Sequence, residues 1–511
     1  MADSCVKRLF TRDPTRIQPT EHRNRDTMKR QPCFGSLPRA HLQTLPIELL
    51  HLVFDHLSLQ DVLAARKTCS ALAHVGTHHF GDEVPLVYHR DKFQALCEIA
   101  KHPQISKRMR SLFYVSDRCL WVPYEEWDHE RPDPQRWKET NQPRPYFMGF
   151  DSGVWNRQHC EAARKRISGV SESSRRKGYE IFEALCQDAI EIHKTGYDLA
   201  CLRSLFKACP QLREVTITSK HECTRRLDAE LKAFADAMTP LEDHSLRDAG
   251  LSQVLTLATA VQEASIPLDS LTLRYVSPGL FDISSLALRA VVRPLRRLRM
   301  LIQFDTDTIE FEDWGADNTQ YLARMNNFRE LLAEARDLRV LNLHLPVEYQ
   351  DDPDKRSGAR LDYAIGDVTF AHLYELTVGG CEVEAEFLVD LILRHKATLR
   401  RLSLGWVSLI NRGVTSWRTV FTRLSGQLPK LYFVSLSGEL CENGRKKLTL
   451  NTYFRRALEE FVMKGGQWPS SRSSANRRSG RSNLLLNLPD DNMERDDPAR
   501  HYKRDEFDQF E

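Results

Sequence analysis

The feature that most constrains the fold of this chain is a short apolar pattern, L-x-x-L-x-L, which recurs six times after residue 202. Inside each copy the apolar residues alternate as they do in a β-strand with one buried face. Intervening stretches such as 320–335 and 386–395 instead have the three- and four-residue spacing of amphipathic helices. The sequence therefore predicts a strand and helix unit that repeats along the chain. The six copies are Leu212, Val215, Ile217; Leu268, Leu271, Leu273; Leu338, Leu341, Leu343; Leu373, Leu376, Val378; Leu399, Leu402, Leu404; and Leu431, Val434, Leu436.

The copies are irregularly spaced, because their first residues are separated by 56, 70, 35, 26 and 32 positions. A weaker copy, Leu295, Leu298 and Met300, lies inside the longest gap. The copy at Leu373 continues to Cys381, where we expect the chain to turn toward the convex side. Stacked units of this kind predict an α/β solenoid whose concave strand face suits the binding of a protein. The alternative is an ordinary α/β domain in which each copy is simply a buried strand.

A different pattern occupies residues 42–80, where the spacing predicts three short amphipathic helices. Pro46 suits the first turn of a helix that runs to about His56, Ser58 is a candidate N-cap for the second helix, and a third begins near Cys69. Three such helices bury too little surface to be stable alone, so we expect contacts with the next domain or with a partner to stabilise this unit. The apolar stripe of the first helix consists of Leu49, Leu50, Val53, Phe54 and Leu57.

The segment from Leu42 to Phe80 resembles an F-box, whose usual form is L-P-x-E-L-L, a helix that ends in an aliphatic or aromatic pair and Leu, then S-x-x-D-L and a final helix. An ordinary three-helix packing unit is the alternative. The order of F-box, variable insert and irregular leucine-rich repeats is similar to that of many F-box proteins of filamentous fungi. The matching residues are Leu45, Pro46, Glu48, Leu49, Val53, Phe54 and Leu57, followed by Asp61, Val62 and Leu63.

The resemblance implies that this segment binds a Skp-family adaptor, which links it to the cullin and RING subunits of an SCF ubiquitin ligase. The chain would then be a non-catalytic adaptor that recognises an unknown target protein through its repeats. The alternative is a leucine-rich-repeat scaffold with no part in ubiquitin transfer. A departure from the family, the cationic run Arg66-Lys67 before Cys69, leaves the packing of the third helix open. The implied adaptor-binding residues are Leu45, Pro46, Glu48, Leu49, Val53, Phe54, Leu57 and Leu63.

These patterns divide the chain into five parts. The stretch from Trp121 to Trp155 contains four of the eight tryptophans and is predicted to be a long loop, either pinned to its own domain or used for recognition. The expected parts are a basic disordered leader at 1–40, the F-box at 41–81, a helical linker with the Pro- and Trp-rich insert at 82–200, the leucine-rich-repeat-like domain at 201–466 and a disordered tail at 467–511.

Composition excludes several classes of function. The 73 Lys and Arg nearly balance the 70 Asp and Glu, so no strong positive field predicts a nucleic-acid partner, despite the basic triplets at 164–166 and 175–177. No apolar run approaches the roughly 20 residues that span a bilayer. No hydrophobic stretch at the N-terminus resembles a secretory signal. We therefore expect no membrane partner and a location in the cytosol or nucleus.

No catalytic residue, metal site or cofactor is predicted. The 12 cysteines lack CxxC spacing, which favours reduced thiols, and no GxxxxGK[ST], HExxH, GxSxG or Rossmann glycine pattern occurs. The pairs His78-His79, His159-Cys160, and His221 with Cys223 could be metal or catalytic pairs, but adjacent side chains usually point apart, so ordinary structural roles are favoured.

Overall fold

In the residues that the structure describes, ten β-strands form one sheet, and they lie in it in the same order as in the chain. Strands β1 to β9 pair in parallel, and β10 closes the sheet as an antiparallel partner of β9. The strands are β1 (Glu83–Val87), β2 (Ser111–Val115), β3 (Glu214–Thr218), β4 (Ser270–Val276), β5 (Arg297–Ile302), β6 (Val340–His344), β7 (Glu375–Glu384), β8 (Arg401–Ile410), β9 (Phe433–Glu442) and β10 (Lys446–Leu448). The computed structural model describes residues 45–57, 59–77, 79, 83–116, 121, 123–129, 171–218, 250–282, 286–302, 319–345, 359–410, 416–442, 446–448, 450 and 452–469.

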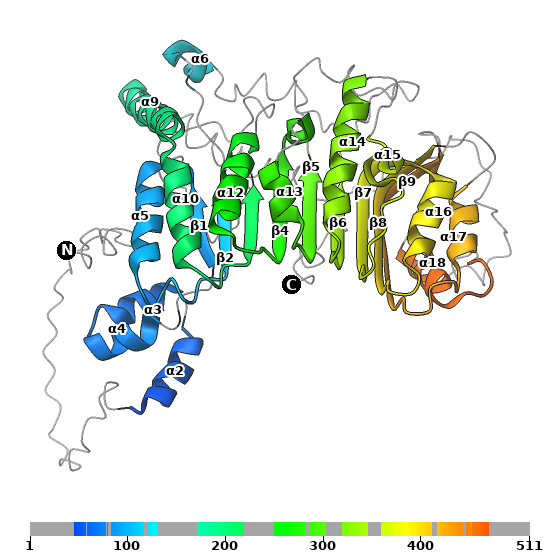
Figure 1. The fold of residues 1–511 in the computed structure, drawn as a ribbon, viewed down its shortest axis with the longest axis horizontal. Helices are drawn as coiled ribbons and strands as arrows, with labels where there is room; N and C mark the ends of the chain where they lie inside the picture. The colour runs from blue at the N-terminus through cyan, green and yellow to red at the C-terminus, as the bar shows by residue number, and fades with distance from the viewer. Residues whose placement is uncertain are drawn as a thin grey trace, which may run out of the picture.

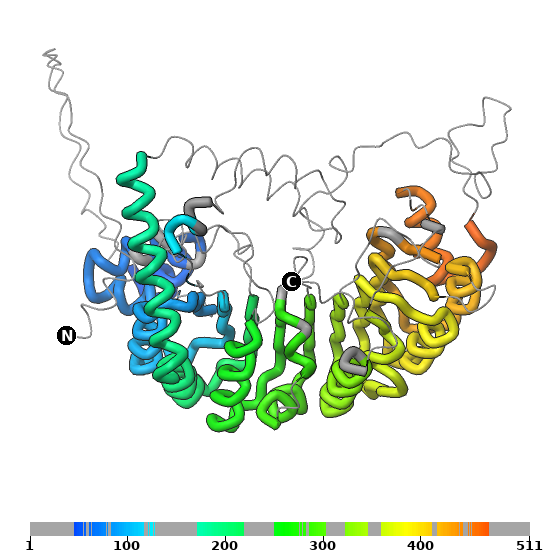
Figure 2. The backbone as a smooth tube through the Cα atoms, turned by 90° about the horizontal axis from the view of Figure 1, so that it is seen from above, coloured from blue at the N-terminus to red at the C-terminus, as the bar shows by residue number. Residues whose placement is uncertain are grey.

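Helices cover one side of this sheet. Seen from above, the chain forms an arc in which the strands line the inner side and the helices the outer side (Figure 2). The chain is therefore a curved solenoid of strand and helix units. The covering helices are α5 (Arg90–Lys101), α10 (Tyr197–Ala208), α12 (Leu251–Ala264), α13 (Leu286–Val292), α14 (Thr319–Glu334), α15 (Leu361–Ile365), α16 (Ala385–Arg394), α17 (Trp417–Leu424) and α18 (Thr452–Lys464), with a 3-10 turn, η3 (Pro278–Asp282).

The core lies between the sheet and these helices and is built from rows of apolar residues that match from strand to strand. Each repeat contributes its two alternating strand residues to the same two rows, because the strands pair without a shift in this part of the sheet. The leucine at the start of each L-x-x-L-x-L copy is also buried. One row is Val215, Leu271, Leu298, Leu341, Leu376, Leu402 and Val434, and the next is Ile217, Leu273, Met300, Leu343, Val378, Leu404 and Leu436.

The strand and helix predictions for the repeats are confirmed. All six copies of the pattern, and the weaker one at Leu295, lie at the strands β3 to β9, and helices α14 and α16 begin and end within one residue of the expected stretches. Strands that follow one another in strict order, with the connecting helices on one side, are typical of a solenoid. Doubly wound α/β domains instead place helices on both faces. The alternative of an ordinary α/β domain is thus not supported.

The expected linker at 82–200 differs from the structure. Strands β1 and β2 lie in this region and belong to the same sheet, so the solenoid begins at Glu83 rather than at residue 201. The sequence did contain a signal for β2, because Met109, Leu112 and Tyr114 have the spacing of the repeat with bulky apolar residues in place of leucine, and all three are buried. A search restricted to aliphatic residues misses such a copy.

Part of the Trp-rich insert packs against the solenoid, which agrees with one of the two alternatives that the sequence left open. Helix α6 (Tyr124–His129) places Trp127, which is 1% exposed, against Tyr179 and Phe182 of the long helix α9 (Glu172–Thr195). The same small core includes Val87 of β1 and Val115 of β2. Residues 130–170 of the insert and the linker, the expected leader and nearly all of the expected tail lie outside the described residues.

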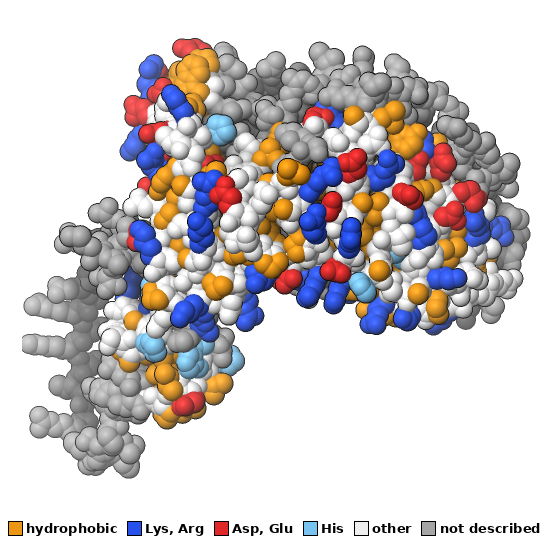
Figure 3. Space-filling model, in the orientation of Figure 1, with side chains coloured by type: hydrophobic (Ala, Val, Ile, Leu, Met, Phe, Trp, Pro, Cys, Tyr) orange, Lys and Arg blue, Asp and Glu red, His pale blue; other side chains and the backbone are white. Residues whose placement is uncertain are grey.

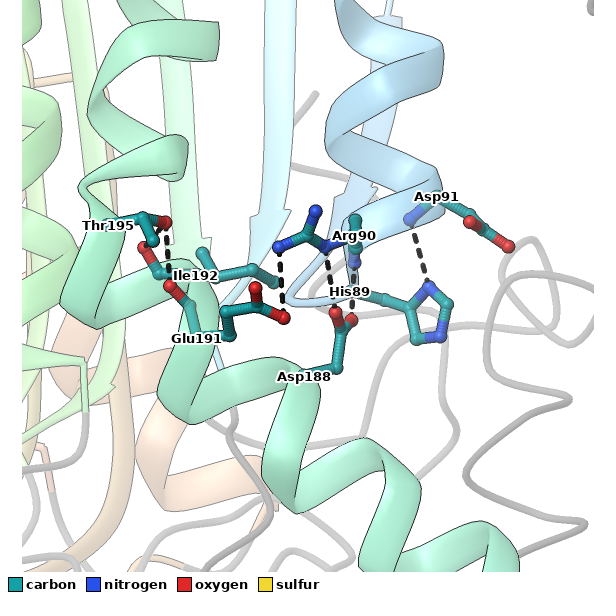
Figure 4. A network of polar contacts seen from close by, with 7 residues as sticks. All are labelled: His89, Arg90, Asp91, Asp188, Glu191, Ile192 and Thr195. Carbon is teal, nitrogen blue, oxygen red and sulfur yellow. Dashed lines mark hydrogen bonds and ion pairs between the residues drawn. The ribbon is translucent and has the colours of Figure 1, made fainter.

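Helix α9 is joined to the first solenoid unit by a polar network (Figure 4). The backbone N–H of Arg90 donates to Oδ2 of Asp188 at 2.7 Å, and its guanidinium lies 3.3 Å from Oδ1 of the same carboxylate. A second ion pair joins Arg90 to Glu191 at 3.2 Å. Asp188 thereby satisfies a free N–H in the first turn of α5, where negative charge is favourable. These contacts fix α9 across the end of the arc.

Candidate interaction surfaces

The three helices before the sheet form a separate unit with its own core. They are α2 (Ile47–Asp55), α3 (Leu59–Arg66) and α4 (Ser70–Thr77), and they lie below the first unit of the solenoid in Figure 1. The predicted three helices are confirmed in number and position among the described residues of this segment. The predicted N-cap Ser58 lies outside the described residues. The buried core consists of Leu50, Phe54, Val62, Leu72 and Val75.

Helix α2 exposes a set of large apolar side chains to solvent. Leu52 is 58% exposed, Ile47 47%, Leu49 45% and Val53 37%. These four residues, which we call the α2 apolar face, belong to a single nine-residue helix. Leu49, Leu52 and Val53 lie on the side of the helix opposite Leu50 and Phe54, and Ile47 lies at its first residue. Several exposed aliphatic side chains on one short helix are typical of an interaction site, whereas single ones need no explanation.

Most of the adaptor-binding residues implied by the sequence lie at or near this surface. Leu49 and Val53 belong to the α2 apolar face, and Pro46 and Glu48 beside them are exposed. Leu45 and Leu57 are partly buried against the helical core. Leu63 lies in α3, but its side chain is outside the described part.

The F-box resemblance implied that Phe54 contacts the adaptor. In the structure its side chain is 1% exposed and packs inside the three-helix core. The stripe predicted from the sequence is in fact divided: Leu50 and Phe54 face inward, and Leu49 and Val53 face outward. Ile47 and Leu52 were not predicted as site residues. Leu52 lies outside the inward stripe of Leu50 and Phe54, which was the available signal for it. Ile47 continues that stripe by helical spacing and is exposed at the first residue of the helix.

Arg66 fits into the unit through a close approach between α3 and α4. Its Nε donates to the backbone oxygen of Ala73 at 3.2 Å. Gly76 makes room for this contact, since a Cβ at that position would lie 2.3 Å from Cγ of Arg66 and 2.9 Å from the Phe54 ring. The cationic end of the second helix, which departs from the F-box pattern, is therefore accommodated by a glycine on the third.

The second candidate surface is the inner face of the arc. On β3, Val215 and Ile217 point to the helices, so Glu214 and Thr216 point to the inner side, and the other strands alternate in the same way. The small core of α6 and α9 covers the end of this face at β1 and β2. Among the described residues, the part of the inner face that this small core leaves uncovered extends from β3 to β9.

Short polar side chains dominate the middle of this inner face. Charged residues flank them in internal pairs, Arg297 with Glu214, and Arg401 with Glu375 at 3.5 Å. Arg401 also lies over the ring of Phe433, 4.7 Å from its centroid. A surface of short hydrogen-bonding side chains lets another polypeptide approach the strands closely. The central row consists of Thr216, Thr272, Arg299, Asn342, Thr377, Ser403 and Ser435.

The described residues contain no group of three or more His, Cys, Asp or Glu side chains that could hold a metal ion. Of the pairs weighed from the sequence, His79 contacts His51 with 2.8 Å between their ring nitrogens, and the pairs at 159–160 and 221–223 lie outside the described residues. Within the described helices, none is long and apolar enough to cross a membrane.

Comparison with known families matches residues 42–78 to the F-box domain. This match covers the segment whose helices carry the α2 apolar face, and it confirms the F-box resemblance found in the sequence. A comparison with curated proteins finds no match. The chain thus carries an F-box near its N-terminus, followed by a solenoid of strand and helix units.

Proposed function

We propose that this chain is the target-recognition subunit of an SCF-type ubiquitin ligase. Its F-box docks a Skp-family adaptor, which links it to the cullin and RING subunits, and its solenoid holds the target protein. The observation that carries the proposal is the α2 apolar face, because it exposes four aliphatic side chains within the matched F-box segment. We propose that the chain is located in the cytosol or nucleus.

The α2 apolar face supports docking in energetic terms. Each aliphatic side chain that moves from water into a partner's pocket contributes roughly 1 kcal/mol when about half of its surface is newly buried. Leu49 and Leu52 are the leucines of this face, and both are about half exposed in the free chain. Phe54 supports the same surface from inside, since it holds α2 against α4 without reaching the surface itself.

We assign the solenoid to the leucine-rich-repeat class, on the basis of its recurring L-x-x-L-x-L strands and buried leucines. In this class the inner face is an extended binding surface rather than a pocket. The inner face of strands β3 to β9, with its short polar side chains, suits the binding of a folded or extended target. The chain would then raise the rate of ubiquitin transfer by holding the target at a high local concentration near the ubiquitin-charged enzyme.

The proposal is tested by measuring the affinity of the full chain for a purified Skp-family adaptor. Leu49→Ala combined with Leu52→Ala should weaken binding roughly thirtyfold, since two side chains that each bury half of their surface on docking are worth about 2 kcal/mol together. The matched control is Leu286→Ala with Tyr453→Ala, because these side chains are 79% and 84% exposed on the solenoid helices. This control should bind as the wild type does.

Phe54→Ala provides a contrast, because removal of its buried ring should unfold the F-box helices and abolish binding with a loss of helical signal. The Leu49 and Leu52 variant should lose binding with its circular dichroism unchanged. If the wild-type chain does not bind the adaptor, or the double variant binds normally, the docking proposal fails. Recovery of the adaptor without cullin from cells would favour the alternative, a scaffold outside ubiquitin transfer.

A further inference from the structure

Positive charge gathers at one edge of the solenoid, where each helix ends and the next strand begins. We call this the basic edge and define it as the turns that precede strands β2 to β9, residues 102–110, 209–213, 265–269, 293–296, 335–339, 366–374, 395–400 and 425–432. These turns contain eleven Lys and Arg but only three Asp and no Glu, a surplus of eight on a chain whose formal net charge is +3. In Figure 3, Lys and Arg side chains follow the lower margin of the solenoid.

Five of the eight arginines of the basic edge form a row, because they occupy equivalent positions of one backbone ladder. In this ladder the residue just before each strand donates its N–H to the carbonyl of the equivalent residue one strand earlier, with N···O distances of 2.8 to 3.0 Å. Strands are about 4.8 Å apart, so the eight positions extend over about 34 Å. In order along the sheet they are Arg110, Arg213, Asp269, Arg296, Arg339, Tyr374, Arg400 and Tyr432.

A purely structural role accounts for some of this charge. Cations near helix C-termini are favourable, and each of these turns follows a helix. Arg293 pairs with Glu334 at 2.9 Å, and Arg296 lies 3.9 Å from Asp269. For Arg339 and Arg400, both exposed, no ion pair with another described residue is found. Their guanidinium groups, and the exposed Lys396 and Lys430, remain available to an anionic partner.

The geometry of the row indicates the kind of partner. It is one residue wide, and Glu214 and Glu375 on the adjoining inner face each neutralise an arginine, Arg297 and Arg401, so these pairs add no net positive charge for a broad polyanion such as a nucleic-acid duplex. An extended polypeptide of about ten residues covers the same length, and its carboxylates can meet arginines at separate points. Arginine also binds carboxylates through two parallel N–H groups. We propose that the basic edge binds an Asp- and Glu-rich segment of a partner protein.

This binding site would be distinct from both surfaces of the proposed function. The basic edge lies on neither the α2 apolar face nor the inner face of the arc, and its test does not involve the adaptor. In Figure 1 the F-box helices lie below the same edge. A protein bound at the basic edge would therefore lie on the same side of the solenoid as the partner of the F-box. Neither protein would lie at the opposite edge, where the strands end.

Fluorescence anisotropy with the full chain and a labelled twelve-residue peptide of alternating Glu and Ser tests the proposal. The peptide should bind, and the triple variant Arg296→Ala, Arg339→Ala, Arg400→Ala should bind it about tenfold more weakly, as expected for three exposed charge contacts. Higher salt should weaken binding by the wild type more than by the variant. The matched control, Lys177→Ala, Lys194→Ala, Arg456→Ala, removes three exposed charges elsewhere and should bind as the wild type does.

Three results would overturn the proposal. The first is no binding of the acidic peptide by the wild type at low salt, and the second is equal loss in the two triple variants, which would indicate an effect of net charge alone. The third is tighter binding of a twelve-nucleotide oligo-dT than of the peptide, which would assign the edge to single-stranded nucleic acid. Circular dichroism of each variant separates lost binding from lost structure.

Discussion

Two histidines at strand β6 and helix α16 are held in their neutral form by burial. Burial lowers the pKa of His344 to about 4, and its Nε2 is buried with no hydrogen-bond partner. Burial also lowers the pKa of His395. The neutral ring of His395 forms two hydrogen bonds: Nε2 accepts from the Phe370 N–H at 3.0 Å, and Nδ1 donates to the backbone oxygen of Leu391 at 2.8 Å. Protonation of either ring would cost stability.

The pKa of His344 predicts a loss of stability in mild acid. A histidine whose folded pKa lies below its unfolded value of about 6.5 binds more protons when unfolded. Its contribution is therefore fully present above pH 6.5 and is lost as the pH falls toward 4, by up to about 3 kcal/mol. Urea titrations from pH 4 to 8 should show this loss, and His344→Gln should reduce it. The exposed His372→Gln is the control, and an equal slope in the His344 and His372 variants would refute the prediction.

At the scale of the element, strands β7, β8 and β9 share a kink at equivalent positions. Gly380, Trp406 and Gly438 all have left-handed backbones, with φ of 59°, 58° and 64°. The residues before them are paired in register, and β8 and β9 shift their register just after. The predicted turn at Cys381 thus occurs one residue earlier, at Gly380, and the strand continues to Glu384. A repeated kink of this kind lets each strand bend within the stack.

Gly380 should be the least replaceable of these positions. A Cβ there would lie 2.1 Å from the backbone oxygen of Leu345, and a left-handed φ adds strain for any other residue. Gly380→Ala should therefore lower the free energy of unfolding by about 3 kcal/mol. Gly196→Ala is the matched control, because Gly196 has a φ of 62° but nothing within 4 Å of its Cβ position, so only about 1 kcal/mol is expected. Denaturant midpoints measure both, and equal losses would contradict the role of the Leu345 contact.

The whole molecule has separate hydrophobic cores, and none of the buried residues of the F-box core belongs to the core of the sheet. A chain that begins at residue 83 should consequently keep the solenoid folded, with a thermal midpoint within about 2 °C of the full chain. Removal of α18 should act differently, because Phe454, Leu458 and Val462 belong to the sheet core. A chain that ends at residue 451 should melt roughly 10 °C lower. Loss of the solenoid transition on removal of the F-box would show that the two cores depend on each other.

The sequence alone determined the repeating unit and the F-box. Alternating aliphatic residues such as Leu376 and Val378 specify a strand with one buried face, and the spacing around Leu49 specifies an amphipathic helix. Both patterns depend on side chains a few residues apart, so they are visible in the chain itself. The gaps between copies did not reveal β1 or β2, although the spacing of Met109, Leu112 and Tyr114 was a signal for β2. Their place in the sheet depends on pairing with β3, which lies about 100 residues further along the chain.

Only the tertiary structure decided which apolar residues of α2 face outward. Phe54 and Val53 are neighbours in one stripe, but α4 covers the first and leaves the second 37% exposed. The structure alone also assembled the basic edge, because Arg110 and Arg400 lie 290 residues apart and the strand ladder brings them into one row. Periodicity along a chain records local conformation, whereas exposure and charge density depend on what packs beside each residue.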